Sequence, residues 1–340
     1  MTSSSDPAGE AGPLRAGRWA RTLATQPKPT LGIVEVVRPF RFGLQSTSTT
    51  PEDVAGDARA AENAGFDIFQ VGDHVGAEPS ALVSLTAAAL GTQRIHIGTL
   101  VLNNDLRHPV VLAQELATLD HLSQGRLEVG LGAGHSFTEY AAMGRPFDPP
   151  AVRKERLGES VEILRELLDG HVLTRRGVHY ALHEAETLPS LQAHVPILVG
   201  VNGRAALTHA LGHADIVAPT MLGRTKEDGH RHDVRWEAER LDDTIAWMRA
   251  AAGERWDSIE LHALVQAVVV TDDRADAAAV IAQRAGIAVA DALSTPYVCV
   301  GTHAEIAAHL IDCRERWGFS YFSVRNVEAF APVLALLHGQ

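Results

Sequence analysis

An aspartate and a histidine stand side by side just after a hydrophobic run in this 340-residue chain. The run at residues 66–71 is typical of a β-strand, and Asp73 and His74 follow it after one glycine. Taken alone, the pair is equally typical of a turn in which Asp73 bonds to nearby backbone. Both side chains can also exchange protons with a substrate, so their position in the fold decides between the two interpretations.

Glycine-rich stretches follow two further hydrophobic runs. The glycines at 130, 132 and 134 do not have the GxGxxG spacing of a dinucleotide fingerprint, so we interpret them as positions where a flat ring or phosphates approach the backbone. Residues 200–203 lead directly into a predicted helix. Its free N–H groups form a candidate anion site to which Arg204 adds charge, with a plain strand-to-helix turn as the alternative.

Seventeen histidines require that metal chemistry be considered. The pattern His230-x-His232 lies in a polar loop, and neither HExxH nor the GxSxG nucleophile pattern occurs in the chain. Asp73, His74 and His135 could be assembled into a metal site of a hydrolase. We keep that as a minor alternative and predict no metal.

The composition excludes several classes of partner. A net charge of −12 without a basic block disfavours nucleic acid and anionic membranes. The two cysteines show no pairing pattern, which favours a cytoplasmic protein. Residues 1–37 have no apolar segment of a secretory signal, and their Ser, Pro and Gly content predicts a flexible N-terminal extension.

Hydrophobic runs alternate with helical patterns through residues 38–340, which predicts one α/β domain. Eight strand–helix units favour a (β/α)8 TIM barrel, with a doubly wound open sheet as the alternative. The strands are expected within 41–45, 66–71, 94–101, 126–132, 195–200, 214–218, 258–270 and 321–324, and the helices within 51–64, 80–90, 108–122, 152–168, 204–211, 234–252, 272–285 and 303–317. In such a barrel the strand ends carry the chemistry, so this architecture favours the functional interpretation of Asp73 and His74.

Three segments are longer than simple connections require. Residues 143–151 and 219–233 are candidate active-site loops, and residues 171–195 are expected to carry a hairpin. We expect these insertions to select the substrate, whose identity the sequence does not reveal.

Several stretches together resemble the bacterial luciferase-like monooxygenase superfamily, and most closely its actinobacterial branch of coenzyme F420-dependent oxidoreductases. The resemblance runs in order from Arg38 to Leu337. The stretches are RPFRFGLQ (38–45), AENAGFDIFQVGDH (61–74), RIHIGTLVLNNDLRHPVVLAQELATLDHLSQGRLEVGLGAGHS (94–136), RPFDPPAVRKERLGESVEIL (145–164), PILVGVNGRAALTHALGHADIVAP (196–219) and VGTHAEIAAHL…RERWGFSYFSV (300–324).

This resemblance implies a luciferase-like barrel that holds F420, or FMN as the alternative, at its C-terminal rim. It implies a non-prolyl cis peptide between Leu100 and Val101, and a proton-transfer role for His74 with Asp73 orienting it or contacting the ring. His135 is a further candidate acid or base. The implied cofactor-binding residues are Gln45, Asp73, Leu100, Val101, Asn103, Ala133, Gly134, Thr138, Gly200, Val201, Asn202, Gly203, Ala205 and Ala206.

The chain departs from the sugar-phosphate dehydrogenases of that family at three positions. They carry Trp at the position of Glu78, Glu at the position of His135 and Asn at the position of Thr138, so a different small-molecule substrate is expected. The resemblance also implies a homodimer. The alternatives to an F420-dependent hydride-transfer enzyme are an FMN-dependent monooxygenase that uses O2, a non-catalytic flavin-binding barrel and the metal-dependent hydrolase.

Overall fold

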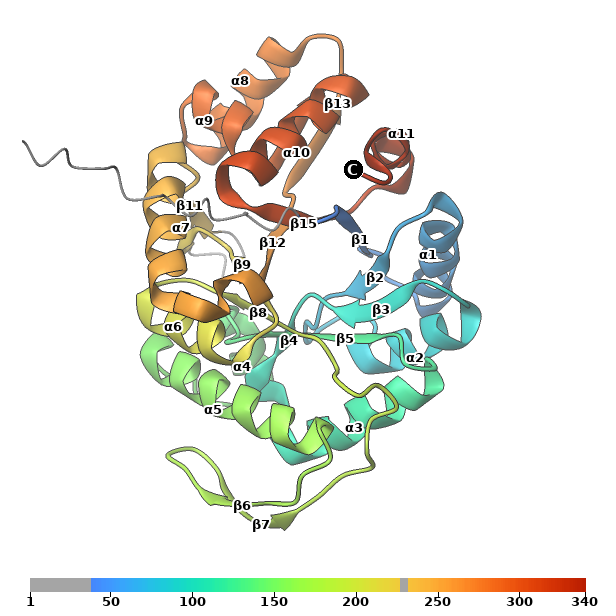
Figure 1. Ribbon diagram of the computed structural model, residues 1–340, viewed down its shortest axis with the longest axis vertical. Helices are drawn as coiled ribbons and strands as arrows, with labels where there is room; N and C mark the ends of the chain where they lie inside the picture. Colours follow the sequence, from blue (N-terminus) through green and yellow to red (C-terminus); the bar gives the residue numbers. More distant parts are fainter. Residues whose placement is uncertain (1–37, 227–231) are drawn as a thin grey trace, which may run out of the picture. The chain divides into compact units, whose positions relative to one another are not determined.

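The computed structural model describes residues 38–226 and 232–340, and the predicted N-terminal extension at 1–37 lies outside them. The described part contains a closed parallel barrel in the ring order β1-β2-β3-β5-β8-β9-β12-β15, with β4 continuing β3 (Figure 1). This confirms the predicted (β/α)8 fold. The barrel strands are β1 (Arg41–Gln45), β2 (Ile68–Val71), β3 (His96–Thr99), β4 (Leu102–Asn103), β5 (Leu127–Gly132), β8 (Ile197–Val201), β9 (Ile216–Pro219), β12 (Glu260–Leu264) and β15 (Phe319–Val324).

Helices between the strands cover the outside of the barrel (Figure 1). The predicted helices are all present, with ends shifted by a few residues at most. They are α1 (Pro51–Ala64), α2 (Ala81–Gly91), α3 (Pro109–Leu122), α5 (Pro150–Leu168), α6 (Arg204–His213), α7 (Ala238–Ala252), α8 (Arg274–Ala285) and α10 (His303–Trp317), joined by the unpredicted α4 (Phe137–Ala142), α9 (Val289–Ser294) and α11 (Val327–Leu337) and two 3₁₀ turns, η1 (Asn104–Leu106) and η2 (Gly253–Ser258).

Local sequence explains where the helices begin and end. In α1 the Thr50 side chain accepts a hydrogen bond from the Asp53 N–H, Pro51 occupies the first turn, and Gly65 ends the helix with a left-handed φ of 87°. In α10 a reciprocal capping box joins Thr302 and Glu305. These signals lie in short sequence windows, so the boundaries could be predicted.

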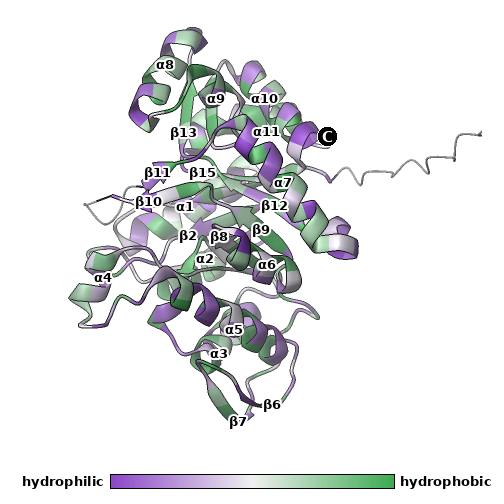
Figure 2. Ribbon diagram, turned by 90° about the vertical axis from the view of Figure 1, so that its left-hand side faces the viewer, coloured by the Kyte–Doolittle hydropathy of each residue, from purple (hydrophilic) through white to green (hydrophobic). Residues whose placement is uncertain are grey.

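Two apolar layers stabilise the barrel. The larger one lies between the strands and the surrounding helices, and a smaller one fills the barrel interior around Leu100, Leu198, Ile216 and Tyr321. Figure 2 shows the hydrophobic colour concentrated on the strands, while the helices also carry hydrophilic residues. None of the helices within 38–226 and 232–340 has the length and apolar character that crossing a membrane requires.

The third barrel strand is interrupted. β3 pairs with β5 at Gly98 and Glu128, whereas β4 pairs with β5 at Leu102 and Leu131. The third strand therefore uses one residue more than β5 between these two pairs, as in a β-bulge. The interruption contains the Leu100–Val101 peptide bond, which is cis as the sequence resemblance implied.

The seventh strand was predicted within 258–270, and the structure divides this range. β12 belongs to the barrel, whereas β13 (Ala267–Val270) pairs in parallel with β14 (Val298–Gly301) in a separate two-stranded sheet. β14 was not predicted. Its four residues lie between Pro296 and the Thr302 cap of α10, and they are too few to show the period of a strand.

The predicted hairpin within 171–195 is present as β6 (Leu173–Arg176) and β7 (Ala181–Ala185), and its part in selecting the substrate stays a prediction. The segment follows the carboxyl end of α5 and precedes β8, so it starts and ends at the amino-terminal end of the strands. Figure 1 shows the hairpin outside α3 and α5, away from the barrel. Its turn nevertheless reaches the starts of α3 and α5, where the Tyr180 and His108 ring centroids are 5.4 Å apart and His179 lies 3.3 Å from Glu155.

The amino-terminal end of the barrel contains a buried ion cluster. Arg41 binds Glu128 at 2.7 Å and Glu260 at 2.6 Å, and the Tyr321 hydroxyl donates to Glu128 at 2.8 Å. A cavity of about 580 Å³ adjoins this cluster and is lined by Arg41, Glu62, Asp67, Arg94, His96 and Glu128 among others. This cavity lies at the end of the barrel opposite to the predicted site residues, and catalytic sites are not expected at that end in this fold.

Candidate active site

The predicted site residues gather at one end of the barrel. All paired barrel strands are parallel, so their carboxyl ends share one rim, which we call the C-terminal rim. The residues follow the strands in this way: Gln45 in β1; Asp73 and His74 after β2; Leu100, Val101 and Asn103 in the interrupted third strand; Ala133, Gly134 and His135 after β5; Thr138 in α4; Gly200, Val201, Asn202 and Gly203 at the end of β8; Ala205 and Ala206 in α6.

The interrupted third strand forms one wall of the rim. The Gln45 side chain donates from Nε2 to the Leu100 carbonyl at 2.6 Å and accepts from Arg325 Nε at 2.8 Å. A Cβ built on Gly132 would lie 2.7 Å from the Val101 Cγ2 atom, so only glycine fits beside Val101. The glycine therefore lets β5 lie directly against the Val101 side chain.

Asp73 is bound by an arginine that the sequence did not single out. Arg107 donates to both Asp73 oxygens, at 2.7 and 3.2 Å, and the Asn103 backbone N–H donates to Asp73 at 3.1 Å. Asp73 is buried, and this bidentate pairing neutralises it. The prediction that Asp73 orients His74 is wrong, because its oxygens bind Arg107 and Asn103; its contact with a ring stays a prediction.

His74 is bound by Glu139 instead. The His74 Nδ1 atom lies 2.8 Å from Glu139 Oε1, and the Val75 N–H donates to the other carboxylate oxygen at 3.5 Å. The hydrogen bond to Glu139 raises the pKa of His74, against the opposing effect of burial. Although burial acts to raise it, the pKa of Glu139 is lowered by the hydrogen bond and charge of His74.

Two further imidazoles lie beside His74. The rings of His74 and His135 are 5.7 Å apart and nearly perpendicular, and His135 lies 5.0 Å from the His232 ring. His232 begins β11 (His232–Val234), which pairs antiparallel with β10 (Leu222–Thr225). Figure 2 shows α4 and this hairpin on the same side of the barrel. The predicted residue His135 is therefore adjacent to His74.

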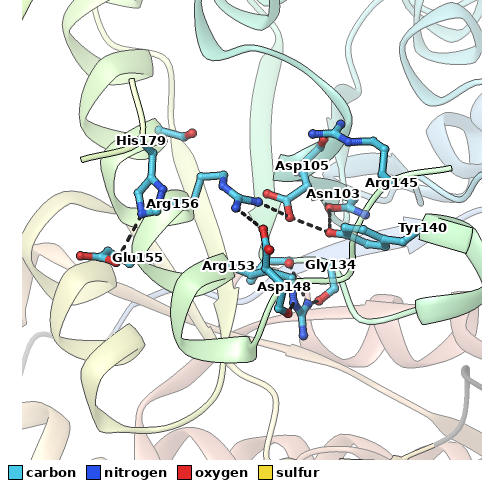
Figure 3. Close-up of polar contacts among 12 residues, drawn as sticks. Asn103, Asp105, Gly134, Tyr140, Arg145, Asp148, Arg153, Glu155, Arg156 and His179 are labelled. Atoms are coloured by element: carbon cyan, nitrogen blue, oxygen red, sulfur yellow. Dashed lines mark hydrogen bonds and ion pairs between the residues drawn. The ribbon is translucent and has the colours of Figure 1, made fainter. Parts of the chain in front are cut away.

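A hydrogen-bond network fixes α4 to the loop after β4 (Figure 3). The Tyr140 hydroxyl donates to Asp105 at 2.8 Å and lies 3.3 Å from the Asn103 side-chain oxygen. Burial and the neighbouring Asp105 carboxylate raise the pKa of Tyr140 to about 12, so the hydroxyl keeps its proton. Arg145 donates to the Asp105 carbonyl.

Arginines at the start of α5 extend the same network (Figure 3). Arg156 binds Asp105 at 2.8 Å and also binds Asp148. Arg153 donates to the Ala133 carbonyl at 3.0 Å and to the Gly134 carbonyl. Gly134 has φ of 71°, and a Cβ there would lie 2.5 Å from the Tyr140 hydroxyl, so this turn requires glycine.

The turn between β8 and α6 has the features of an anion site. Gly203 precedes α6 with φ of 82°, and no side chain caps the first N–H groups of the helix. Lys154 donates to the Asn202 carbonyl at 2.6 Å, and Asn202 donates to the Leu222 carbonyl at 2.8 Å. The Arg204 guanidinium lies over the Trp247 ring instead, 5.5 Å from its centroid.

The sequence interpretation missed Glu139, Arg107 and Lys154. The pattern Ser136-x-x-Glu139 is the usual start of a helix, and it could have revealed α4 and an acid beside the fourth barrel strand. Arg107 and Lys154 reach the site from neighbouring elements, so nothing in their local sequence marks them.

The structure gives no support for the metal alternative. Over residues 38–226 and 232–340, no three His, Cys, Asp or Glu side chains are grouped so that they could hold a metal ion. The three residues considered for such a site are divided, because Asp73 binds Arg107 while His74 binds Glu139.

Comparisons with known proteins agree with this fold. Residues 34–291 match the family model described as luciferase-like monooxygenase. An F420-dependent glucose-6-phosphate dehydrogenase of Nakamurella multipartita is 34% identical over 231 residues, which are 63% of this chain and 68% of the relative. The enzyme of the same name from Beutenbergia cavernae is 37% identical over 49% of this chain and 52% of its own length. The chain thus matches about two thirds of the first relative and about half of the second.

Solved structures share the fold at low sequence identity. An F420-dependent secondary alcohol dehydrogenase in complex with an F420–acetone adduct has a TM-score of 0.70 at 21% identity, over 88% of this chain and 100% of that one. The coenzyme F420-dependent tetrahydromethanopterin reductase from Methanopyrus kandleri has a TM-score of 0.68 at 20% identity, over 87% of this chain and 97% of that one. At these identities the similarity supports the barrel fold alone.

Proposed function

Because the chain belongs to the luciferase-like monooxygenase family, we propose that it is an oxidoreductase that transfers a hydride between coenzyme F420 and a small organic substrate. The name of the relatives supports the choice of this cofactor. The observation that carries the proposal is the combination, on one rim, of a glycine-lined wall and an uncapped helix start with a lysine beside it.

The residues at the rim fit a phosphorylated deazaflavin. We assign the flat ring to the wall at Val101, Gly132 and Gly134. A Cβ on Gly132 would meet Val101 and a Cβ on Gly134 would meet the Tyr140 hydroxyl, so glycine allows β5 and the turn after it to lie this close to their neighbours. The Asn202–Gly203 turn offers free backbone N–H groups and the Lys154 ammonium to a phosphate. We assign the predicted binding residues to F420 on these grounds, and F420 supplies the hydride chemistry when bound.

His74 is the residue that we assign to the proton. It is part-exposed, with 38% of its side chain accessible, while its partner Glu139 is buried. A Cβ built on Gly72 would lie 3.5 Å from His74 Cδ2 and 3.8 Å from Nε2, so the Nε2 edge lies over a position without a side chain. A substrate at that edge could exchange a proton with an imidazole whose ordinary pKa is close to neutral pH.

Cofactor titration tests the proposal directly. Apoprotein is titrated with oxidised and reduced F420 and, in parallel, with oxidised and reduced FMN, and binding is followed by fluorescence. We expect F420 to bind and to be turned over in a screen of small alcohols, aldehydes, ketones and enones, with glucose 6-phosphate as a comparison. Binding of FMN but not F420, or F420 binding without turnover of any compound, would contradict the proposal.

Lys154 provides a quantitative test of the anion site. We expect Lys154→Ala to weaken F420 binding by about 10-fold or more, because a hydrogen bond to a charged group is worth about 1.5–3 kcal/mol. Arg204→Ala is the matched control, since its guanidinium lies over Trp247 and away from the turn. Equal affinity of the two variants would remove Lys154 from the phosphate site.

We also propose that the protein forms a homodimer through α2 and α3. Val83 and Leu90 on α2 are 70% and 64% exposed, and Val111 and Leu122 on α3 are 50% and 41% exposed. Clustered apolar side chains on adjoining helices favour burial in an interface. We expect sedimentation velocity to give a dimer mass for the native protein and a monomer mass for the double variant Val83→Glu, Leu90→Glu. Val280→Glu on α8 is the control, and a native monomer would contradict the proposal.

A further inference from the structure

We propose that Glu139 is the positioning residue for His74: its carboxylate holds Nδ1 of the imidazole, so that Nε2 is the nitrogen presented to the substrate. The contact of 2.8 Å between Nδ1 and Glu139 Oε1 is the observation behind this assignment. The reaction that the pair serves rests on the proposed function, whereas the pair itself can be tested in the protein without cofactor.

The contact determines which nitrogen carries the proton in the neutral imidazole. A carboxylate only accepts hydrogen bonds, so Nδ1 must donate to Glu139 in every state in which Glu139 is ionised. Nε2 then has a free lone pair in neutral His74 and an N–H in the charged form. Because the Nε2 edge lies over Gly72, both forms present the same atom to a substrate.

Glu139 is itself held in place. It lies in the first turn of α4 and is 5% exposed, and the next residue, Tyr140, is 1% exposed and bound to Asp105. The Glu139 N–H also donates to the Ser136 carbonyl at 3.2 Å. A carboxylate on a helix anchored at the adjacent residue has little freedom to leave His74, and this rigidity is what an orienting group requires.

The other charged groups near His74 cannot replace Glu139. Asp73 binds Arg107 through both oxygens, and Glu78 is exposed and acts on His74 only through its charge. The His135 ring lies nearly perpendicular to the His74 ring, with the two centroids 5.7 Å apart. Glu139 is therefore the carboxylate that both accepts a hydrogen bond from the His74 imidazole and places a negative charge beside it.

The sign of the pH effect follows from the pair. The pKa of His74 is raised first by the hydrogen bond to Glu139, then by the charges of Glu139, Glu78 and Asp73, while burial lowers it. Protonated His74 therefore persists to higher pH than an isolated imidazole, and loss of the Glu139 charge shifts its titration to lower pH. In Glu139→Gln the amide oxygen can still accept from Nδ1, so orientation is retained while charge is removed.

The experiment follows the imidazole resonances of the cofactor-free protein by NMR across pH. The His74 signal is identified by its loss in His74→Gln. We expect Glu139→Gln and Glu139→Ala to lower the pKa of His74, Glu139→Asp to restore part of the shift, and Glu139→Ala alone to remove the preference for the Nδ1–H tautomer. Glu78→Gln is the matched control, because it removes one nearby carboxylate that makes no hydrogen bond to His74.

Turnover gives the second readout. We expect Glu139→Ala to lower kcat by about 10- to 100-fold with little change in F420 affinity, the magnitude of one hydrogen bond to a charged group. In Glu139→Gln the His74 limb of the pH–rate profile should move to lower pH. Circular dichroism and thermal unfolding check that each variant is folded, and Glu139→Gln serves if Glu139→Ala does not fold.

The outcomes separate this inference from the proposed function. An unchanged His74 titration in Glu139→Gln, or an equal shift in Glu78→Gln, would overturn the positioning role whatever the cofactor is. A shifted titration together with no F420-dependent turnover in the native protein would leave the pair established and refute the proposed function.

Discussion

Replacement of His74 by alanine is expected to lower F420-dependent turnover by between about 100- and 10,000-fold, the usual contribution of a positioned acid or base. The variant loses the Nε2 atom to which we assign the proton transfer, and it leaves Glu139 without its imidazole partner. The glycine-lined wall and the Lys154 turn are untouched, so F420 affinity should remain that of the native protein. Turnover is measured with the substrate found in the screen of the native enzyme, and affinity by fluorescence titration.

His135→Ala is the matched comparison for that prediction. His135 lies on the same rim, 5.7 Å from His74 between ring centroids, whereas His74 is the imidazole whose Nδ1 atom lies 2.8 Å from Glu139 Oε1. We expect the His135 variant to alter substrate affinity or preference more than kcat. A His74→Ala enzyme that turns over at the native rate would refute the proton role of His74. A His135→Ala enzyme that loses as much turnover as His74→Ala would assign that role to His135 instead.

Removal of Arg41 is expected to have the largest effect on stability. Arg41→Met should lower the free energy of unfolding by about 3–5 kcal/mol, because it leaves buried carboxylates without their cation. Glu128 is 2% exposed and Glu260 is 10% exposed at the side chain, and Arg41 binds both. Methionine replaces much of the arginine stem, so the measured loss reports the charge more than the volume. Urea unfolding followed by circular dichroism gives the value.

The deficit in Arg41→Met should depend on pH. Burial already raises the pKa of Glu260 in the native protein, with Arg41 opposing that effect. Without Arg41 the folded variant binds a proton on this cluster more tightly than the unfolded chain, so its stability falls as pH rises from the ordinary carboxylate value upward. The difference from the native protein should be smallest at acid pH, where the buried carboxylates are protonated.

Arg94→Met is the control for the ion cluster. Arg94 lines the same cavity, but its side chain is 73% exposed and lies 3.9 Å from Glu62. Because Arg94 is largely in solvent and the contact is long, the pair contributes about 0–1 kcal/mol, so the variant should unfold almost as the native protein does. If both variants lost the same amount, or if the deficit of Arg41→Met grew toward acid pH, the account of the cluster would be wrong.

The sequence was sufficient for the barrel because its signals are local. Alternation of strand and helix patterns, Pro51 and Gly65 around α1, and the Thr302–Glu305 box each lie within a few residues. β14 and α4 escaped prediction because each is short and lacks a distinct period. The sequence did not show that the hairpin at 171–195 emerges at the amino-terminal end of the barrel, because length alone does not tell at which end an insertion emerges.

The parts of the site that depend on backbone conformation could be predicted from the sequence. The parts that depend on which charged side chains bind each other could not. The glycines at 132, 134 and 203 occur where the chain turns or approaches another segment, and sequence marks such positions. The partners of charged side chains are set by packing between distant elements. Asp73 and Arg107 are 34 positions apart and His74 and Glu139 are 65 apart, so neighbouring residues gave no indication of either pair.

The extra residue in the third strand also determines which side of the sheet each following side chain faces. In a regular strand Leu100 and Leu102 would point the same way, yet Leu100 packs in the barrel interior and Leu102 in the outer layer against the helices. The irregularity thus reverses the alternation of side chains between the two faces of the strand, so the position of Asn103 falls on the face that points into the barrel. Deletion of one residue between Thr99 and Leu102 would exchange the two sides. Leu102 would then face the interior, and the Asn103 amide would be turned toward the helices.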